Sequence, residues 1–454
     1  MKTTKLALPL FVALAYAPMQ AMAAPLLSGD LNQVTVYARE YFTAGQNTQV
    51  FGSVLSGGVG TTGAGSAIQG FFESTKAANI GASIVGGSQN TISVSGYVKS
   101  GDLVTTGNGS IVNGNVTASG AANVGASAMV KGNVISGDVG TAGANATIKG
   151  DFMSMGANSI GANAKVGGNF VSGGLASTGA NSKVDGAVMA GGAASISTSS
   201  SVSGEVWAVN SSGTQKTLSA SPVSSTMTSA VTGDVIAHVA KDAEILRLAQ
   251  ASLSGMANST AAKMGKNDLN ATLTSNLAAT MTVNTTLYAG VYSAASWSTT
   301  AGTTLKLDGQ GLDNQSWVFN FADILKFGGD TTVMLTNAGA GSSVVWNVNN
   351  GYANLGDGAD VIGTIIANTY VAVGANATVL NVGTNCGGVY SQTSYVSTGA
   401  NSIIGGDGCT GNNLNLNSDG TMAANAAVPE PATYSMLLAG LGLMGFTLRR
   451  RKSA

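Results

Sequence analysis

The sequence predicts an all-β dominated protein built as a β-solenoid (β-helix) with about 18 residues per coil. Between residues 89 and 196 the chain realigns with itself when it is shifted by one such repeat, without any insertion. The composition is also unusual, because the chain holds 64 glycines and only 9% charged residues, against roughly 25% charged in an average soluble domain. Such a chain favours narrow, stacked strands over a bulky globular core.

Each repeat places apolar residues in two fixed columns, with an unbroken glycine column between them. The three columns are two residues apart, so we expect them to share one inward-facing side of a strand. A single strand cannot bury such a side alone, so the repeats are expected to stack at about 4.8 Å per coil. Gly-Ala-Asn phrases suit the corners because Gly and Asn tolerate positive φ. The columns are Val94, Val112, Val130, Ile148, Val166, Val184; Gly96, Gly114, Gly132, Gly150, Gly168, Gly186; and Val98, Val116, Val134, Phe152, Phe170, Val188.

The repeats define an N-terminal Gly-rich solenoid over residues 25–205, followed by a Ser/Thr-rich connector over 206–233. Apolar residues at helical spacing then predict one long amphipathic α-helix over 234–257, capped by Asp234 and packed along the solenoid. A partner-binding or membrane-surface helix is the alternative, but the basic face that it requires is missing. Short β runs return over 258–415, which predicts further solenoid coils.

Both ends of the chain carry targeting signals. Residues 1–24 combine Lys2 and Lys5 with an apolar run and a small-residue triplet, which predicts a signal peptide cut by signal peptidase. An uncleaved anchor is the alternative, although the run is short for a membrane span. A linker over 416–428 leads to the final segment, residues 429–454.

That final segment consists of three parts in a fixed order. A Pro-Glu-Pro triplet precedes an apolar stretch over 432–448, which predicts a C-terminal hydrophobic, transmembrane helix, and a basic cluster follows. A simple tail anchor is one interpretation. The pattern resembles the PEP-CTERM sorting tail of Gram-negative bacteria, which implies export, processing by a membrane sorting enzyme and association with exopolysaccharide in biofilms. We therefore expect a cell-surface or extracellular protein, anchored transiently or stably through this helix. The motif residues are Pro429, Glu430, Pro431, Arg449, Arg450 and Arg451.

Few residues are available for chemistry. Cys386 and Cys409 are the only cysteines, and an even pair in an exported chain predicts a disulfide. His238 is the single histidine, so neither a catalytic triad nor a metal site can be built around it, and we expect a packed or surface residue on the helix.

The charge of the chain is nearly balanced, with Lys+Arg 20 against Asp+Glu 21. This balance gives no basic surface, which argues against nucleic acid as a partner. We predict no enzyme and no cofactor.

Residues of the C-terminal half carry a second resemblance. The phrases "LYAGVYS", "TLKLDGQGLDNQSWVFNF", "SVVWNVNN" and "VIGTIIANTYVAVGANATV" resemble the bacterial ice-binding-like family over about 235–405. This resemblance implies a discontinuous β-solenoid with a long helix packed along it, and ice as a ligand. Choice-of-anchor A proteins, with Gly-rich strands, a helix and further strands, are the second match.

A binder of ice needs a rigid, weakly charged face with regularly spaced small residues. The candidates are Thr303, Thr332, Thr364 and Thr369, if Leu305, Val333 and Ile366 point inward; ordinary strand preference is the alternative explanation for these threonines. Two hypotheses follow. One is a solenoid whose flat polar face binds ice or another ordered surface. The other is a structural or adhesive matrix protein associated with exopolysaccharide, without ice activity. A polysaccharide lyase is a third, but its charged cluster is missing.

Overall fold

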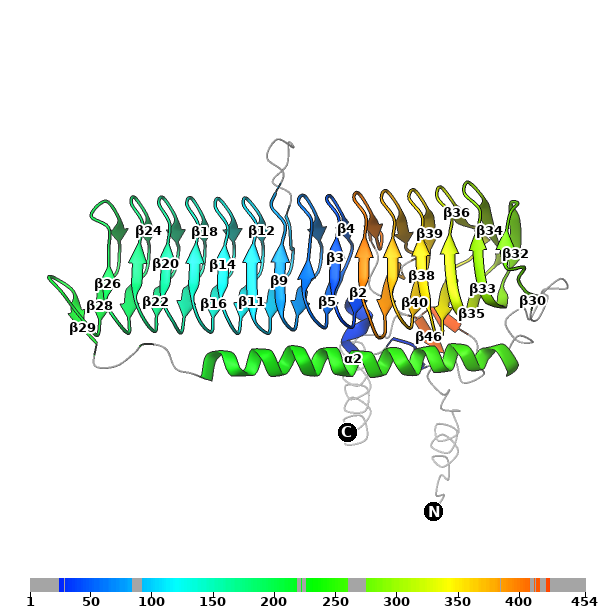
Figure 1. Cartoon of the computed structure of the whole chain (residues 1–454), viewed down its shortest axis with the longest axis horizontal. Helices are drawn as coiled ribbons and strands as arrows, with labels where there is room; N and C mark the ends of the chain where they lie inside the picture. Colours follow the sequence, from blue (N-terminus) through cyan, green and yellow to red (C-terminus); the bar gives the residue numbers. More distant parts are fainter. Residues whose placement is uncertain are drawn as a thin grey trace, which may run out of the picture.

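Short alternations of apolar and polar residues form strands, mostly of two to four residues in the N-terminal half and of up to 12 residues in the C-terminal half, and parallel strands of successive coils pair with one another. The computed structural model describes residues 24–424 except 28, 84–91, 219–221, 223–225, 260–274, 384, 409–411, 413 and 417–421. Within these residues the coils stack into one elongated β-solenoid, with a single α-helix lying lengthwise along it (Figure 1). The predicted fold class is confirmed.

Each coil contributes strands to three faces, which we name in chain order. The helix face, against which the helix packs, contains in the N-terminal half β2 (Val34–Ala38), β5 (Ser53–Ser56), β8 (Phe72–Ser74), β10 (Val98–Ser100), β13 (Val116–Ala118), β16 (Val134–Ser136), β19 (Phe152–Ser154), β22 (Phe170–Ser172), β25 (Val188–Ala190) and β28 (Val206–Ala208). In the C-terminal half it contains β33 (Gly290–Thr299), β35 (Ser316–Phe327), β37 (Ser343–Val348), β40 (Thr364–Ala367) and β43 (Gly388–Ser391).

The other two faces follow after the corners of each coil. The second face contains β3 (Phe42–Ala44), β6 (Gly60–Thr61), β9 (Ala77–Ile80), β11 (Leu103–Thr106), β14 (Ala122–Val124), β17 (Gly140–Ala142), β20 (Asn158–Ile160), β23 (Ala176–Thr178), β26 (Ala194–Ser195), β38 (Tyr352–Leu355), β41 (Val371–Val373) and β44 (Val396–Thr398), together with the ends of β33 and β35. The third face contains β4 (Gln49–Val50), β7 (Ala67–Ile68), β12 (Ile111–Val112), β15 (Met129–Val130), β18 (Thr147–Ile148), β21 (Lys165–Val166), β24 (Lys183–Val184), β27 (Ser201–Val202), β32 (Thr285–Tyr288), β34 (Thr304–Leu312), β36 (Thr332–Ala338), β39 (Asp360–Ile362), β42 (Thr378–Leu380) and β45 (Ile403–Ile404).

The order of coils along the rod differs from their order along the chain. The chain starts in the middle with β2 and coils to one end, which finishes with β29 (Lys216–Thr217). The helix α2 (Thr226–Ser259) then returns along the stack, and the remaining coils run back to the middle (Figure 1). There β43, β44 and β45 pair in parallel with β2, β3 and β4. The two solenoid segments predicted from the sequence are therefore one body.

The interior columns align as the repeat predicts. Val130 pairs with Ile148, Ile148 with Val166 and Val166 with Val184, and all four side chains are buried in one continuous core. The stacked arrangement buries apolar area that no single coil could bury alone.

One detail of the predicted column pattern is wrong. Val112 and Val116 belong to different faces, and Gly114 lies at the corner between them instead of on a shared strand. A Cβ atom on Gly114 would lie 2.7 Å from the carbonyl oxygen of Gly96 in the neighbouring coil. The glycine column exists because corners stack closely, backbone on backbone.

Helix α2 begins well before the predicted Asp234, which lies inside it, and it extends past Gly255. Its apolar residues Val239, Leu246 and Leu253 are buried against the helix face, where they form a second core with residues such as Val318 and Tyr390. The hydroxyl of Tyr37 on β2 donates a hydrogen bond to the carbonyl oxygen of Val239 at 3.0 Å, and burial raises the pKa of this phenol. The helix thus joins coils of both halves.

Candidate functional site

The second face presents an in-register column of small hydroxyl and amide side chains, which we name the hydroxyl–amide column. Strand pairing joins each member to the next across the junction of the two halves and through the N-terminal coils. Every member is at least partly exposed and none is charged. The members are Ser397, Thr43, Thr61, Asn79, Thr105, Asn123, Thr141, Ser159, Ser177 and Ser195.

From Thr105 to Ser195 a constant coil length keeps this column straight. Thr141 and Asn123 are 18 residues apart, and the threonine hydroxyl lies 2.7 Å from the amide oxygen, to which it donates a hydrogen bond. The corners that follow each strand use left-handed backbone, with φ of 60° at Asn145 and 57° at Asn163. This confirms the predicted use of Asn at corners, and it fixes where each outward side chain of the second face lies.

The column is less regular in the C-terminal half. Continuing from Ser397, the pairing leads to Ala372, Asn354, Lys326 and Ser298. A methyl group and an exposed ammonium group therefore interrupt the uncharged polar row. The most uniform array lies in the N-terminal coils and at their junction with the C-terminal half.

A flanking column begins two residues before each member, at the start of the second face. In the C-terminal half and at the junction it is a tyrosine ladder of Tyr352, Tyr370, Tyr395 and Tyr41, with ring centroids 4.6, 4.9 and 4.8 Å apart. Burial raises the pKa of Tyr370 and Tyr395. In the N-terminal coils it becomes an aliphatic flanking column: Val59, Ala77, Leu103, Ala121, Val139, Ala157, Leu175 and Ala193.

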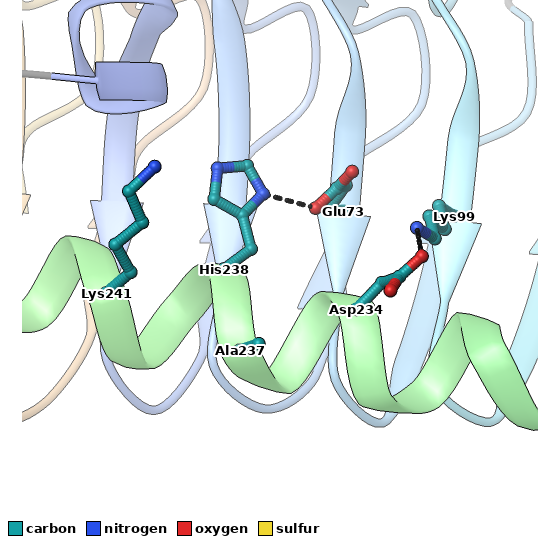
Figure 2. Close-up of a pocket in the computed structure, with 6 residues that line it drawn as sticks. All are labelled: Glu73, Lys99, Asp234, Ala237, His238 and Lys241. Atoms are coloured by element: carbon teal, nitrogen blue, oxygen red, sulfur yellow. Dashed lines mark hydrogen bonds and ion pairs between the residues drawn. The ribbon is translucent and has the colours of Figure 1, made fainter.

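A separate polar cluster lies between α2 and the helix face (Figure 2). His238 Nδ1 is 2.9 Å from Glu73 Oε2, and His238 Nε2 is 3.4 Å from the carboxylate of Asp242. Tyr97 donates a hydrogen bond to the other oxygen of Glu73 at 2.7 Å. Lys99 pairs with Asp234 at 3.3 Å.

The geometry of this cluster favours a structural role. Glu73 and Asp242 are 4% and 0% exposed, and each lies beside the imidazole, so the cluster fixes the position of α2 along the rod. No group of His, Cys, Asp and Glu among the described residues could hold a metal ion. Sequence reasoning placed His238 on the helix but could not find its partners, because Glu73 lies 165 residues away.

The structure does not bring the four predicted threonines together. Thr303 and Thr364 are 6% and 2% exposed, so the expectation that they face solvent is wrong. Thr364 accepts a hydrogen bond from the Asn412 amide at 2.6 Å, which explains its burial. Thr332 lies half-exposed on the third face, paired with Thr304. Thr369 lies in the bend after β40.

The orientation assumed for these threonines holds only in part. Leu305 and Val333 belong to the solenoid interior, as expected. Ile366 instead points outward into the second core beneath α2. Strand β40 is buried on both sides, so alternation along it could not reveal which side is the interior.

The remaining predicted residues lie at the end of the chain. Cys386 is disulfide-bonded, and because Cys409 lies outside the described residues, its pairing with Cys386 stays a prediction. The predicted signal peptide up to Ala23, the sorting triplet at 429–431, the Arg cluster at 449–451 and the C-terminal hydrophobic helix also lie outside the described residues. Within the part of the chain that is described, no helix has the length and apolarity to span a membrane.

Comparison with protein-family models identifies two segments. Residues 209–404 match the ice-binding-like family, and residues 427–452 match the PEP-CTERM protein-sorting motif. The chain thus carries an ice-binding-like domain, which comprises α2 and the C-terminal coils, and an export sorting tail. Both principal resemblances seen in the sequence are confirmed. The tail indicates export and association with the cell surface or membrane.

Several solved structures are similar to the chain. An ice-binding protein from the Antarctic ascomycete Antarctomyces psychrotrophicus is 21% identical, with 52% of this chain and 92% of that chain covered and a TM-score of 0.29. An ice-binding protein domain from Shewanella frigidimarina is 19% identical, with 54% and 92% covered and a TM-score of 0.29. An ice-binding protein from an Antarctic bacterium of the Flavobacteriaceae is 15% identical, with 85% and 100% covered and a TM-score of 0.27.

No curated protein matches the chain. No comparison supports the resemblance to choice-of-anchor A proteins.

Proposed function

We propose that the protein is an exported, non-catalytic binder of an ordered, uncharged surface, and that ice is this surface. The observation that carries the proposal is the hydroxyl–amide column on the second face. It repeats at about 4.8 Å per coil on a rigid parallel sheet, carries no charge, and runs unbroken from Ser397 to Ser195. The ice-binding-like domain supports ice as the expected lattice.

The physical reason is that a periodic, already ordered protein surface can contact a periodic lattice at many points at once. Side chains on paired strands have little conformational freedom to lose on binding, so the conformational entropy cost of binding is small. Polar groups of neighbouring coils, such as Thr141 and Asn123, are also held by mutual hydrogen bonds before any contact is made. A face with scattered charges would have to desolvate them against an uncharged surface.

Two threonines of the same coil offer a matched test. Thr141 lies in the hydroxyl–amide column, whereas Thr147 lies on the third face, and both are half-exposed. Thr141→Tyr should lower thermal hysteresis and inhibition of ice recrystallisation several-fold, because the ring holds the face away from the lattice. Thr147→Tyr should leave both unchanged. Equal loss in both variants, or no ice activity in the wild-type chain, would contradict the proposal.

We also propose that the sorting tail holds the rod at the cell surface with its helix side toward the cell. The support is the small sheet of β1 (Ala24–Pro25), β46 (Leu414–Leu416) and β47 (Met422–Ala424). Leu26, Leu27 and Leu414, in and beside this sheet, pack in the core beneath α2, so the described chain ends on the helix side. Attachment there leaves the second face free.

Deletion of residues 429–454 tests this placement. We expect the variant to move from the cell surface into the medium, with its ice activity unchanged in solution. Undiminished surface retention would reject tethering by the tail. If the wild-type chain lacks ice activity but the deletion alters biofilm, the alternative of an adhesive protein in an exopolysaccharide matrix replaces the first proposal.

A further inference from the structure

The aliphatic flanking column on the second face alternates strictly between a large and a small side chain. Val59, Leu103, Val139 and Leu175 are each followed in the next coil by an alanine. Backbone hydrogen bonds continue the coil-to-coil ladder through these positions, for example from Val104 N to Ala121 O and from Ala122 N to Val139 O. The column therefore forms ridges separated by hollows, with a spacing of about 9.6 Å between ridges at about 4.8 Å per coil.

Three of the four large members of this column are unusually exposed for aliphatic residues, and the fourth, Leu103, is partly exposed. Val59, Val139 and Leu175 are 38%, 37% and 45% exposed, and they belong to the few large apolar side chains of the described chain that face solvent to this degree. A contiguous apolar strip of this kind is typical of a contact surface and not of a solvated one.

We propose that the second face binds a second copy of this chain, with the two rods antiparallel. Only a partner with the same coil rise keeps its features aligned over the whole strip, and another copy has this rise by construction. A twofold axis that lies in the interface, across the rods, at the level between Ala121 and Val139 places each large residue opposite an alanine. The opposed pairs are Val59 with Ala193, Leu103 with Ala157, Val139 with Ala121 and Leu175 with Ala77.

The same axis brings the neighbouring columns into compatible contact. The hydroxyl–amide column faces itself, so that Thr105 lies opposite Ser159 and Asn123 lies opposite Thr141, and these groups can form hydrogen bonds across the interface. The residues just before the flanking column include three charged ones, Lys76, Asp102 and Asp138. Their opposed residues are Gly174, Gly156 and Gly120, so no like charges meet.

A parallel arrangement lacks this fit. A twofold axis along the rods that ran over the flanking column would set each large residue against its own copy, and one that ran between the columns would place the aliphatic flanking column of one copy against the hydroxyl–amide column of the other. Leucine and valine side chains would then bury hydroxyl and amide groups without partners, which is unfavourable. The alternation therefore selects the antiparallel pair.

The size of the strip predicts how tightly the copies bind. It is about 38 Å long at about 4.8 Å per coil and about 13 Å wide at about 3.3 Å per residue, or roughly 500 Å² per copy. The pair would bury about 1,000 Å², which is the lower end for a specific interface. We therefore expect a weak, concentration-dependent dimer. It hides the face that contacts a lattice, so dimer formation and lattice binding exclude each other.

Cysteine cross-linking on the full chain tests the pairing directly. Leu103→Cys and Ala157→Cys, mixed and treated with a short bismaleimide cross-linker, should give at least about tenfold more cross-linked dimer than either variant alone, because antiparallel copies place residue 103 directly across from 157 on sheets about 10 Å apart, whereas residue 103 of the other copy lies about three coils, or about 14 Å, further along the rod. Association through the C-terminal tail would not produce this preference. Equal cross-linking in all three samples, or none in the mixture, would overturn the proposal.

A swap of a ridge and a hollow provides the second test. Ala157→Leu alone places two leucines opposite each other and should weaken dimerisation several-fold in sedimentation experiments. Adding Leu103→Ala restores a large residue opposite a small one and should restore dimerisation. Failure of the double variant to recover would count against the interface. Neither test involves ice, so loss of dimerisation and loss of ice activity are distinguishable results.

Discussion

The N-terminal coils (residues 34–217) and the C-terminal coils (residues 275–404) both stack in parallel, but they differ in coil length and in how their interior is filled. In most N-terminal coils, side chains that meet in neighbouring coils are 18 residues apart, as for Thr141 and Asn123; one longer coil separates Asn79 from Thr105 by 26 residues. In the C-terminal coils the separation varies more widely: it is 18 residues for Ala353 and Val371 and 28 residues for Thr304 and Thr332. The longer coils enclose a wider interior, which large aromatic rings fill: Phe319 and Trp346 stack with ring centroids 4.0 Å apart.

The difference shows what an ordered outer face requires. Identical coils place equivalent side chains at identical positions, so the hydroxyl–amide column stays unbroken through the N-terminal coils. Where coil length varies, the interior is well packed but the outer column is interrupted, as at Lys326. The ice-binding-like family match covers the less regular half. The regular array lies largely outside that match, in the N-terminal coils.

The largest expected effect comes from removing an interior ring of the N-terminal coils. Phe170 is fully buried and packs against Phe152, so Phe170→Ala should cost about 3–5 kcal/mol of unfolding free energy. Coils of a solenoid contact only their neighbours, so the loss should unfold the N-terminal end first. Trp297, Trp317 and Trp346, all buried in the C-terminal half, should keep their fluorescence while circular dichroism already falls.

This experiment is best done with Trp207→Phe, because Trp207 is the one tryptophan of the N-terminal coils. Trp346→Ala is the matched change in the other half and should reverse the order of the two signals. A single transition seen by both probes would show that the two halves unfold together, and would reject independent behaviour.

A smaller effect is expected at the contact between α2 and the N-terminal coils. Glu73→Gln keeps the shape of the side chain but removes the charge that faces His238, and it changes the acceptor for Tyr97. Because Glu73 is buried, we expect a loss of about 1–3 kcal/mol in unfolding free energy and faster protease cleavage within α2. Glu244→Gln on the exposed side of α2, where Glu244 pairs with Arg247, is the control and should change neither. Equal effects from both changes would contradict the assigned role of the cluster.

Much of the fold could be predicted because every repeat places its apolar residues at the same positions, and these positions indicate how successive coils pack. Val130, Ile148 and Val166 recur at a constant interval, and an equal interval allows only in-register stacking. The corner position of Gly114 was missed because inward-facing residues can be two residues apart both along one strand and across the bend between two strands. The order of coils was also missed, because nothing in β2 or β43 marks them as partners over such a distance in the chain.

The candidate site was harder to predict for a related reason. The residue type in the hydroxyl–amide column changes between Thr, Asn and Ser, so no single letter recurs, and its continuity depends on pairing between Ser397 and Thr43. The predicted threonines came from the C-terminal half, where coil length varies and register cannot be inferred from alternation. Thr364 illustrates the problem, because it is buried beside Asn412, to which no sequence pattern links it.

The smallest expected effect concerns the corners, where both halves place an asparagine in left-handed backbone. Asn163 in the N-terminal coils and Asn376 in the C-terminal coils have φ of 57° and 55°. Alanine in this left-handed region costs roughly 1 kcal/mol, whereas glycine adopts it freely. Asn163→Ala should therefore lower the denaturation midpoint slightly, and Asn163→Gly should leave it almost unchanged. At Asn376 the side-chain oxygen also accepts a hydrogen bond from Asn401 at 3.0 Å, so Asn376→Gly should be measurably destabilising as well. If Asn163→Gly destabilises the chain as much as Asn163→Ala, then the side chain, and not the backbone angle, determines which residue this corner requires.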